Sequence, residues 1–221
     1  MSSEPRNAVI FDLDGVLTDT AHFHFIAWQK IAHQVGVEFG EAENEALKGI
    51  DRMRSLEMIL SRSDMTFTDA EVFALAEQKN THYQSLIAEM TPDDVFPGVN
   101  TLIQGLKAEG FGLGVASVSK NAEFVLTRIG LLDEFEFVAD AAKIKNTKPD
   151  PEIFLTVASA LSVPPEQCIG IEDSQAGVTA IKAANMPAIG VGSADTLTQA
   201  DTIVARTGDI TPALITQWLN K

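Results

Sequence analysis

The sequence is poor in cysteine, in basic residues and in long apolar runs. Among its 221 residues only Cys168 is a cysteine, which excludes an intramolecular disulfide framework. Cys168 lies in an apolar run and is predicted to be an inert core residue. Lys and Arg number 16 against 31 Asp and Glu, and the net charge of −15 argues against non-specific binding to nucleic acid or an anionic membrane. An anionic ligand would therefore need a locally positive pocket or a metal ion.

Long hydrophobic segments are also missing. No segment approaches the roughly 20 apolar residues of a membrane span, and the apolar run near the N-terminus is too short for a signal peptide. Hydrophobic residues nevertheless make up 45% of the chain, enough for a substantial core in one large domain or a domain with an insertion. We expect a cytoplasmic monomer with no membrane and no nucleic-acid partner.

Short apolar runs alternate with helical patterns along most of the chain. Strands are predicted at 8–11, 113–116, 137–139, 168–171, 188–191 and 202–205, and helices at 102–107, 123–129, 151–161 and 175–184. Strands that alternate with helices pair in parallel through right-handed crossovers. The expected fold class is therefore α/β, with a doubly wound, Rossmann-like parallel sheet.

A block of helical patterns interrupts this alternation after the first strand. Helices are predicted over 20–35, 53–60 and 68–88, and the last opens on a capping box formed by Thr68 and Glu71. The turn-rich segment 91–98 follows. We expect a small all-helical cap, residues 18–90, inserted into an α/β core formed by residues 1–17 and 91–221.

Two carboxylates, Asp12 and Asp14, follow the first strand with one apolar residue between them. Because side chains alternate along a strand, the two can start on the same side of the chain, and Gly15 permits a sharp turn. Such a pair can hold a hard cation such as Mg²⁺. An Asp-rich turn that ends a strand is the plainer interpretation, and these residues alone leave both open.

Further polar residues follow the other predicted strands. In doubly wound sheets the ligand lies beyond the carboxyl ends of the strands. The residues at those ends are Ser117, Ser119, Lys120, Asn121, Lys148, Glu172 and Asp173. Lys148 and the pair Glu172-Asp173 have structural alternatives, because loop lysines are usually solvated and acids often cap helices. Together, carboxylates, hydroxyls and a lysine from four strand ends suit a metal-bound phosphate.

With these motifs the chain resembles the haloacid dehalogenase superfamily of phosphoryl-transfer enzymes. The four motifs of that superfamily are matched, in order, by Asp12-Leu-Asp14-Gly-Val-Leu-Thr, Ser117, Lys148 and Glu172-Asp173. The helical insert sits where the superfamily carries its small cap. Within the superfamily, the cap residues are similar to those of the β-phosphoglucomutase family: Thr18-Asp-Thr20, His24, Trp28, Leu47-Lys48-Gly49-Ile50, Arg52, Ser55 and Lys79-Asn80.

The resemblance implies roles for the core residues. Asp12 would be the nucleophile that becomes phosphorylated, and Asp14 the general acid/base. Lys148 would neutralise the transferring phosphate, and Ser117 and the backbone at Val118 would hydrogen-bond it. One Mg²⁺ per site would be held by Asp12, the backbone carbonyl of Asp14, Glu172 and Asp173.

The resemblance assigns substrate specificity to the cap. Thr20, His24 and Trp28 are spaced i, i+4 and i+8 and share one helix stripe. Packing inside the cap would explain His24 and Trp28 equally well. The resemblance instead implies that Thr20 and His24 link cap closure to the acid/base, and that Arg52 binds the phosphate that is not transferred. Further substrate contacts are implied for Trp28, Lys48, Gly49, Ile50, Asp51, Ser55, Lys79, Ser119, Lys120 and Asn121.

Asp51 departs from the family pattern, in which the residue before this arginine is usually a serine. An acid beside Arg52 would either weaken phosphate binding or point to solvent. The departure leaves the reaction class intact and puts the identity of the sugar in question.

The implied reaction interconverts β-D-glucose 1-phosphate and β-D-glucose 6-phosphate through a phospho-aspartate enzyme, with β-glucose 1,6-bisphosphate as the priming intermediate. Small sugar phosphates are therefore the expected partners. A sugar-phosphate phosphatase with the same core is an alternative, although hydrolysis needs no second phosphate site such as Arg52 with Ser119–Asn121. A non-enzymatic phospho-aspartate signalling domain is another, but such domains lack the cap and the second Asp.

Overall fold

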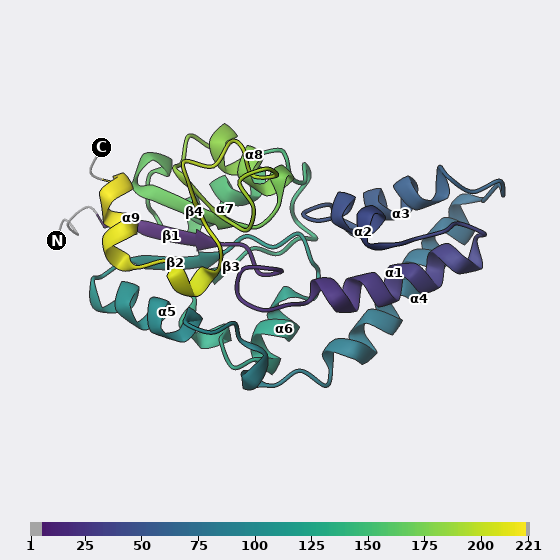
Figure 1. Cartoon of the computed structure of the whole chain (residues 1–221), viewed down its shortest axis with the longest axis horizontal. Helices are drawn as coiled ribbons and strands as arrows, with labels where there is room; N and C mark the ends of the chain where they lie inside the picture. Colours follow the sequence, from purple (N-terminus) through teal and green to yellow (C-terminus); the bar gives the residue numbers. More distant parts are fainter. Residues whose placement is uncertain (1–5, 220–221) are drawn as a thin grey trace.

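A six-stranded parallel sheet runs through the larger part of the computed structural model, which describes residues 6–219 (Figure 1). Its strands are β1 (Ala8–Phe11), β2 (Gly112–Val115), β3 (Phe137–Val138), β4 (Cys168–Glu172), β5 (Ala188–Val191) and β6 (Thr202–Val204). Their order is β3-β2-β1-β4-β5-β6, and all neighbours pair in parallel. The predicted doubly wound sheet is confirmed. The order reverses at β1, where such folds bind their ligands.

Helices cover both faces of this sheet. On one face lie α5 (Val99–Ala108), α6 (Ala122–Arg128) and α9 (Pro212–Leu219), and on the other α7 (Glu152–Ala160) and α8 (Gln175–Ala183) (Figure 1). The side chains of β1 alternate between the two resulting cores. Val9 and Phe11 pack into the first core, and Ala8 and Ile10 into the second. Burial on both faces explains why β1 is a continuous apolar run.

Four helices form the cap, which projects from one end of the sheet (Figure 1). They are α1 (Ala21–Gln34), α2 (Glu41–Ala46), α3 (Arg52–Leu60) and α4 (Asp69–Ile87). A hydrophobic cluster, including Trp28 and Leu56, holds α1, α3 and α4 together. The predicted capping box opens α4: the Glu71 amide donates to Thr68 Oγ1 at 3.3 Å, and the Thr68 amide donates to Glu71 Oε2 at 2.8 Å.

The two chain segments that join the cap to the core lie side by side. Thr18 forms an antiparallel bridge with Val95, and its hydroxyl donates to the carbonyl of Asp94 at 2.7 Å. The short 3₁₀ turn η1 (Pro92–Asp94) lies here. The expected division between core and cap, after residues 17 and 90, falls next to this pairing and stays a prediction.

Two helices were not among the predicted elements. The six-residue helix α2 has no buried residue, so it carries no apolar stripe for a pattern to reveal. In the short C-terminal helix α9 only Ile215 is buried. Within residues 6–219, no helix combines the length and apolar character needed to cross a membrane.

Gly170 sets how closely α8 can approach the sheet, and an alanine there should destabilise the fold. A Cβ on Gly170 would lie 2.5 Å from two side-chain carbons of Ile181. We expect Gly170→Ala to lower the free energy of unfolding by about 1–3 kcal/mol, as overpacking of a core does. Urea unfolding measures this change. Gly112→Ala is the matched control in β2, because its Cβ would meet only the flexible end of the Arg6 side chain, at 3.2 Å; equal losses in both variants would contradict the argument.

Candidate active site

The carboxyl ends of the central strands open into a cavity of about 1140 Å³ that the cap covers from the opposite side. Asp12, Asp14, Lys148 and Asp173 line it from the core. Cap residues form the facing wall: His24, Trp28, Lys48, Gly49, Ile50, Asp51, Arg52, Ser55 and Lys79. The predicted core and cap residues therefore meet in one cavity.

Lys148 forms a buried ion triad with two carboxylates. Its Nζ donates to Asp12 Oδ1 at 2.7 Å and to Glu172 Oε2 at 2.8 Å. The lysine side chain has no exposed surface, so the alternative of a solvated loop lysine is wrong. Burial alone would lower the pKa of Lys148, but Asp12 and Glu172 outweigh it and raise the pKa, so the ammonium stays charged.

Glu172 points toward Lys148, and Ser174, two residues later, precedes helix α8. Ser174 is the N-cap, and its hydroxyl accepts from the Gly177 amide at 3.0 Å. Glu172 Oε1 in turn accepts from the Ser174 amide at 3.1 Å and the Ser174 hydroxyl at 2.7 Å. The capping alternative for the two acids is therefore wrong, since the cap is Ser174. The second carboxylate oxygen of Glu172 is turned to Lys148.

Asp12, Glu172 and Asp173 place carboxylate oxygens within 4.8 Å of one another. Burial raises the pKa of Asp173 to about 7, with Glu172 adding to the shift, and burial together with Glu172 raises the pKa of Asp12. One buried ammonium does not compensate three such acids, and hard oxygen ligands suit Mg²⁺. Gly15 lets the loop pass this close, because a Cβ there would lie 2.2 Å from Asp173 Oδ2.

Asp14 is held by the residue that opens the cap. The hydroxyl of Thr20, the N-cap position of α1, donates to Asp14 Oδ1. Burial raises the pKa of Asp14 to about 6, although Lys148 and Lys79 act in the opposite direction. A carboxyl with a pKa near neutrality can both give and take a proton.

Lys79 is a buried cation surrounded by rings. Its Nζ lies 2.7 Å from His24 Nδ1 and 4.5 Å from the centre of the Trp28 ring. His24 also stacks on Tyr83, a residue that the sequence did not single out, with ring centres 4.1 Å apart. Burial lowers the pKa of Lys79 to about 7, and the nearby charge of Arg52 contributes. His24 and Trp28 thus pack within the cap and also line the cavity, and their roles toward the acid/base and the substrate stay predictions.

The loop between α2 and α3 rests on the core. Lys48 Nζ lies 3.0 Å from Glu45 Oε2 and 3.5 Å from Asp173 Oδ2. Gly49 has a φ of +72°, and a Cβ there would lie 2.5 Å from Ser174 Oγ. Only glycine therefore lets the cap come this close to the start of α8.

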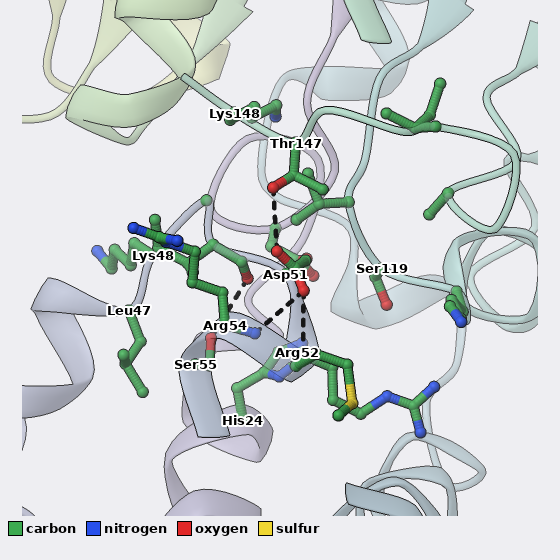
Figure 2. A pocket seen from close by; sticks show the side chains of 18 of the residues that line it. His24, Leu47, Lys48, Asp51, Arg52, Arg54, Ser55, Ser119, Thr147 and Lys148 are labelled. Carbon is green, nitrogen blue, oxygen red and sulfur yellow. Dashed lines mark hydrogen bonds between the residues drawn. The ribbon is translucent and has the colours of Figure 1, made fainter. Parts of the chain in front are cut away.

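Asp51 links the cap to the loop that carries Lys148. Its Oδ1 accepts from the amides of Met53 and Arg54 at 3.0 and 3.2 Å, so it is the N-cap of α3. Its Oδ2 accepts from the Thr147 hydroxyl at 3.0 Å, as Figure 2 shows. The alternative that Asp51 points to solvent is wrong, because both of its oxygens accept hydrogen bonds. An effect of Asp51 on phosphate binding stays a prediction. Thr147 was missed, although its position beside Lys148 was a usable signal.

Arg52 is paired inside the cap. Its Nη1 donates to Glu77 Oε1 at 2.8 Å and to the Ala76 carbonyl at 3.4 Å. Glu77 was not predicted as a site residue, because an exposed acid on a helix carries no distinguishing pattern.

The loop after β2 completes the cavity wall and contacts α4. Its lining residues are Val118, Ser119, Lys120 and Asn121. Asn121 accepts from Gln84 Nε2 and donates to Asn80 Oδ1, both at 2.9 Å. Ser117 lies underneath, and its hydroxyl accepts from the Ser119 amide at 3.2 Å. Three predicted residues, Thr20, Ser117 and Glu172, are fully buried and support the wall without lining it.

Known proteins of similar sequence include mutases and phosphatases. The chain is 46% identical to the β-phosphoglucomutase of Bacillus subtilis (strain 168) over 210 residues, which cover 94% of this chain and 93% of that protein. It is 31% identical over 186 residues to the phosphorylated carbohydrates phosphatase of Thermotoga maritima, covering 82% and 83% of the two chains.

Solved structures include a close match as well. The crystal structure of β-phosphoglucomutase from Clostridium difficile superposes with a TM-score of 0.94 at 46% identity and covers 97% of both chains. The sequence model of haloacid dehalogenase-like hydrolases matches residues 7–185, from the first strand to the end of α8. These residues include the whole cap and all four strand-end motifs, and the chain belongs to the haloacid dehalogenase-like hydrolase family.

Proposed function

We propose that this protein is a Mg²⁺-dependent β-phosphoglucomutase, which interconverts β-D-glucose 1-phosphate and β-D-glucose 6-phosphate. The observation that carries the proposal is that one cavity holds both Asp12, with its charged partner Lys148, and a second cationic position at Arg52 on the facing wall. A mutase must hold two phosphates at once, one reacting and one at rest. The 46% identity to a β-phosphoglucomutase over nearly the whole chain supports the same choice.

Asp12 would carry the phosphoryl group. In the first half-reaction a hydroxyl of the sugar phosphate attacks phospho-Asp12, the P–O bond to Asp12 breaks, and β-glucose 1,6-bisphosphate forms. In the second, Asp12 attacks the other phosphate and releases the isomer. The ammonium of Lys148 already bonds Asp12 at 2.7 Å and would neutralise phosphoryl oxygens as charge moves between acceptor and donor.

Asp14 would move the proton in both halves. It takes the proton of the attacking hydroxyl and returns a proton to the oxygen that leaves. Its raised pKa, about 6, suits both tasks. Since Thr20 holds Asp14 and begins the cap helix α1, cap closure would also set the position of the acid/base.

Asp12, Glu172, Asp173 and the backbone carbonyl of Asp14 would hold Mg²⁺. When bound, the ion supplies positive charge to the phosphoryl group and to the acids around it. The side chains of Lys48, Lys79 and Trp28 would contact the sugar from the cap, and Ser119–Asn121 would assist Arg52. Cap contacts would also exclude water, which is required because hydrolysis of phospho-Asp12 ends the cycle. The monomeric state and cytoplasmic location stay predictions.

Product analysis tests the proposed reaction. Purified protein with Mg²⁺, β-glucose 1-phosphate and a trace of the 1,6-bisphosphate should produce glucose 6-phosphate with little free phosphate, both followed in the same sample. Chelation of the metal with EDTA should stop the reaction, and added Mg²⁺ should restore it. Stoichiometric phosphate release without isomer would instead identify a phosphatase.

Replacement of each carboxylate separates the two proposed roles. Asp12→Asn should abolish the phosphoenzyme and lower turnover by about three orders of magnitude or more. Asp14→Asn should still be phosphorylated by acetyl phosphate, whose leaving group needs no proton, but should not turn over the sugar phosphate. Intact-mass spectrometry detects the phosphoenzyme. Phosphorylation of the Asp12→Asn variant would show that another residue is the nucleophile.

The buried amine of Lys79 should make stability depend on pH. Its folded pKa, about 7, lies below the value in the unfolded chain, so from pH 7 upward the unfolded state binds the extra proton and wild-type stability rises with pH. Lys79→Met removes this dependence and should therefore stabilise the protein more at about pH 6 than at about pH 9. Urea unfolding at both pH values measures it. The exposed Lys30→Met is the control; identical pH slopes in Lys79→Met and wild type would contradict the assignment.

A further inference from the structure

The guanidinium of Arg52 is held by a carboxylate from the neighbouring helix. Arg52 begins α3, and Glu77 lies on α4, with Nη1 and Oε1 2.8 Å apart. Both residues line the cavity. The Arg52 side chain is 18% exposed, whereas that of Glu77 is 53% exposed and can turn into solvent without leaving a buried charge. The pair thus joins a fixed cation to a carboxylate that is free to move.

Asp51, the acid next to Arg52 in the sequence, does not compete for this guanidinium. Its two oxygens are bound by the Met53 and Arg54 amides and by the Thr147 hydroxyl. Within residues 6–219, Glu77 is the carboxylate that forms an ion pair with Arg52. The sequence suggested that Asp51 weakens phosphate binding at Arg52; from the observed ion pair, this effect is expected of Glu77 instead.

A phosphate at Arg52 would have to replace Glu77. Arginine binds phosphate through paired N–H groups, and one of these nitrogens already donates to Glu77. A partly exposed ion pair is weak, so a phosphate dianion, with more charge and three acceptor oxygens, can displace it. A ligand group with less charge, or with none, gains less free energy when it replaces Glu77 at Arg52.

We propose that Glu77 is a further substrate-binding determinant, which competes with the resting phosphate of a sugar phosphate for Arg52 and so limits how tightly that phosphate is held. The inference rests on the proposed function in one respect, the assignment of Arg52 to the second phosphate. Glu77 lowers the affinity for each ligand that displaces it from Arg52, by the strength of their ion pair. It therefore allows the bisphosphate to leave Arg52 and turn around between the half-reactions.

Glu77→Gln tests the competition, because it removes the charge and keeps the shape. We expect inorganic phosphate and glucose 6-phosphate to bind about 2- to 5-fold more tightly by isothermal titration calorimetry, the range that a weak ion pair allows, with KM lowered by the same factor. Glu57→Gln is the matched control, since Glu57 lines the same cavity without an ion pair to Arg52.

A double-mutant cycle assigns the effect to Arg52. In an Arg52→Ala background, Glu77→Gln should no longer change the affinity. Unchanged or weaker phosphate binding in Glu77→Gln would overturn the inference, and so would an equal gain in Glu57→Gln or a gain that persists without Arg52. Phosphate binding is measured without turnover, so the result is independent of whether product analysis finds isomerisation or hydrolysis.

Discussion

The ammonium group of Lys148 fixes the active site, because it is buried and bonds acids from two neighbouring strands, Asp12 after β1 and Glu172 at the end of β4. Loss of one partner from such a buried pair leaves an uncompensated charge, which costs about 3–5 kcal/mol. The triad therefore holds the carboxyl ends of the two strands and the loop before α7 in one arrangement. Glu172 extends it to Ser174 and the start of α8. The cation for which we propose a catalytic role is thus also a structural one.

Cap and core meet at residues that adjoin the reacting groups. Thr20 contacts Asp14, Lys48 pairs with Asp173, and Asp51 bonds the neighbour of Lys148. Movement of the cap would thus act directly on the proposed acid/base, on a proposed metal ligand and on the loop that carries Lys148. This arrangement suits a reaction in which an intermediate must turn around while water is kept out.

The sheet and its strand ends could be predicted because both follow from local pattern. Strands such as β1 are buried on two faces and are apolar throughout, and the carboxyl ends of parallel strands gather polar residues in one place. Contacts between distant segments could not be predicted. Thr147 and Asp51 are 96 positions apart in sequence, and Arg52 and Glu77 are 25 apart. Neither the burial of Lys148 nor the ion pair of Arg52 can be recognised from the amino-acid composition or from the spacing of apolar residues.

Asp51 gives the cap an unusual property. The same carboxylate closes the first turn of α3 and accepts a hydrogen bond from the core. Separation of cap and core would break the bond to Thr147 and leave Asp51 with its two hydrogen bonds to the amides at the start of α3. That first turn begins with Arg52. A single carboxylate thus connects the loop that carries Thr147 to the start of the helix that carries the arginine.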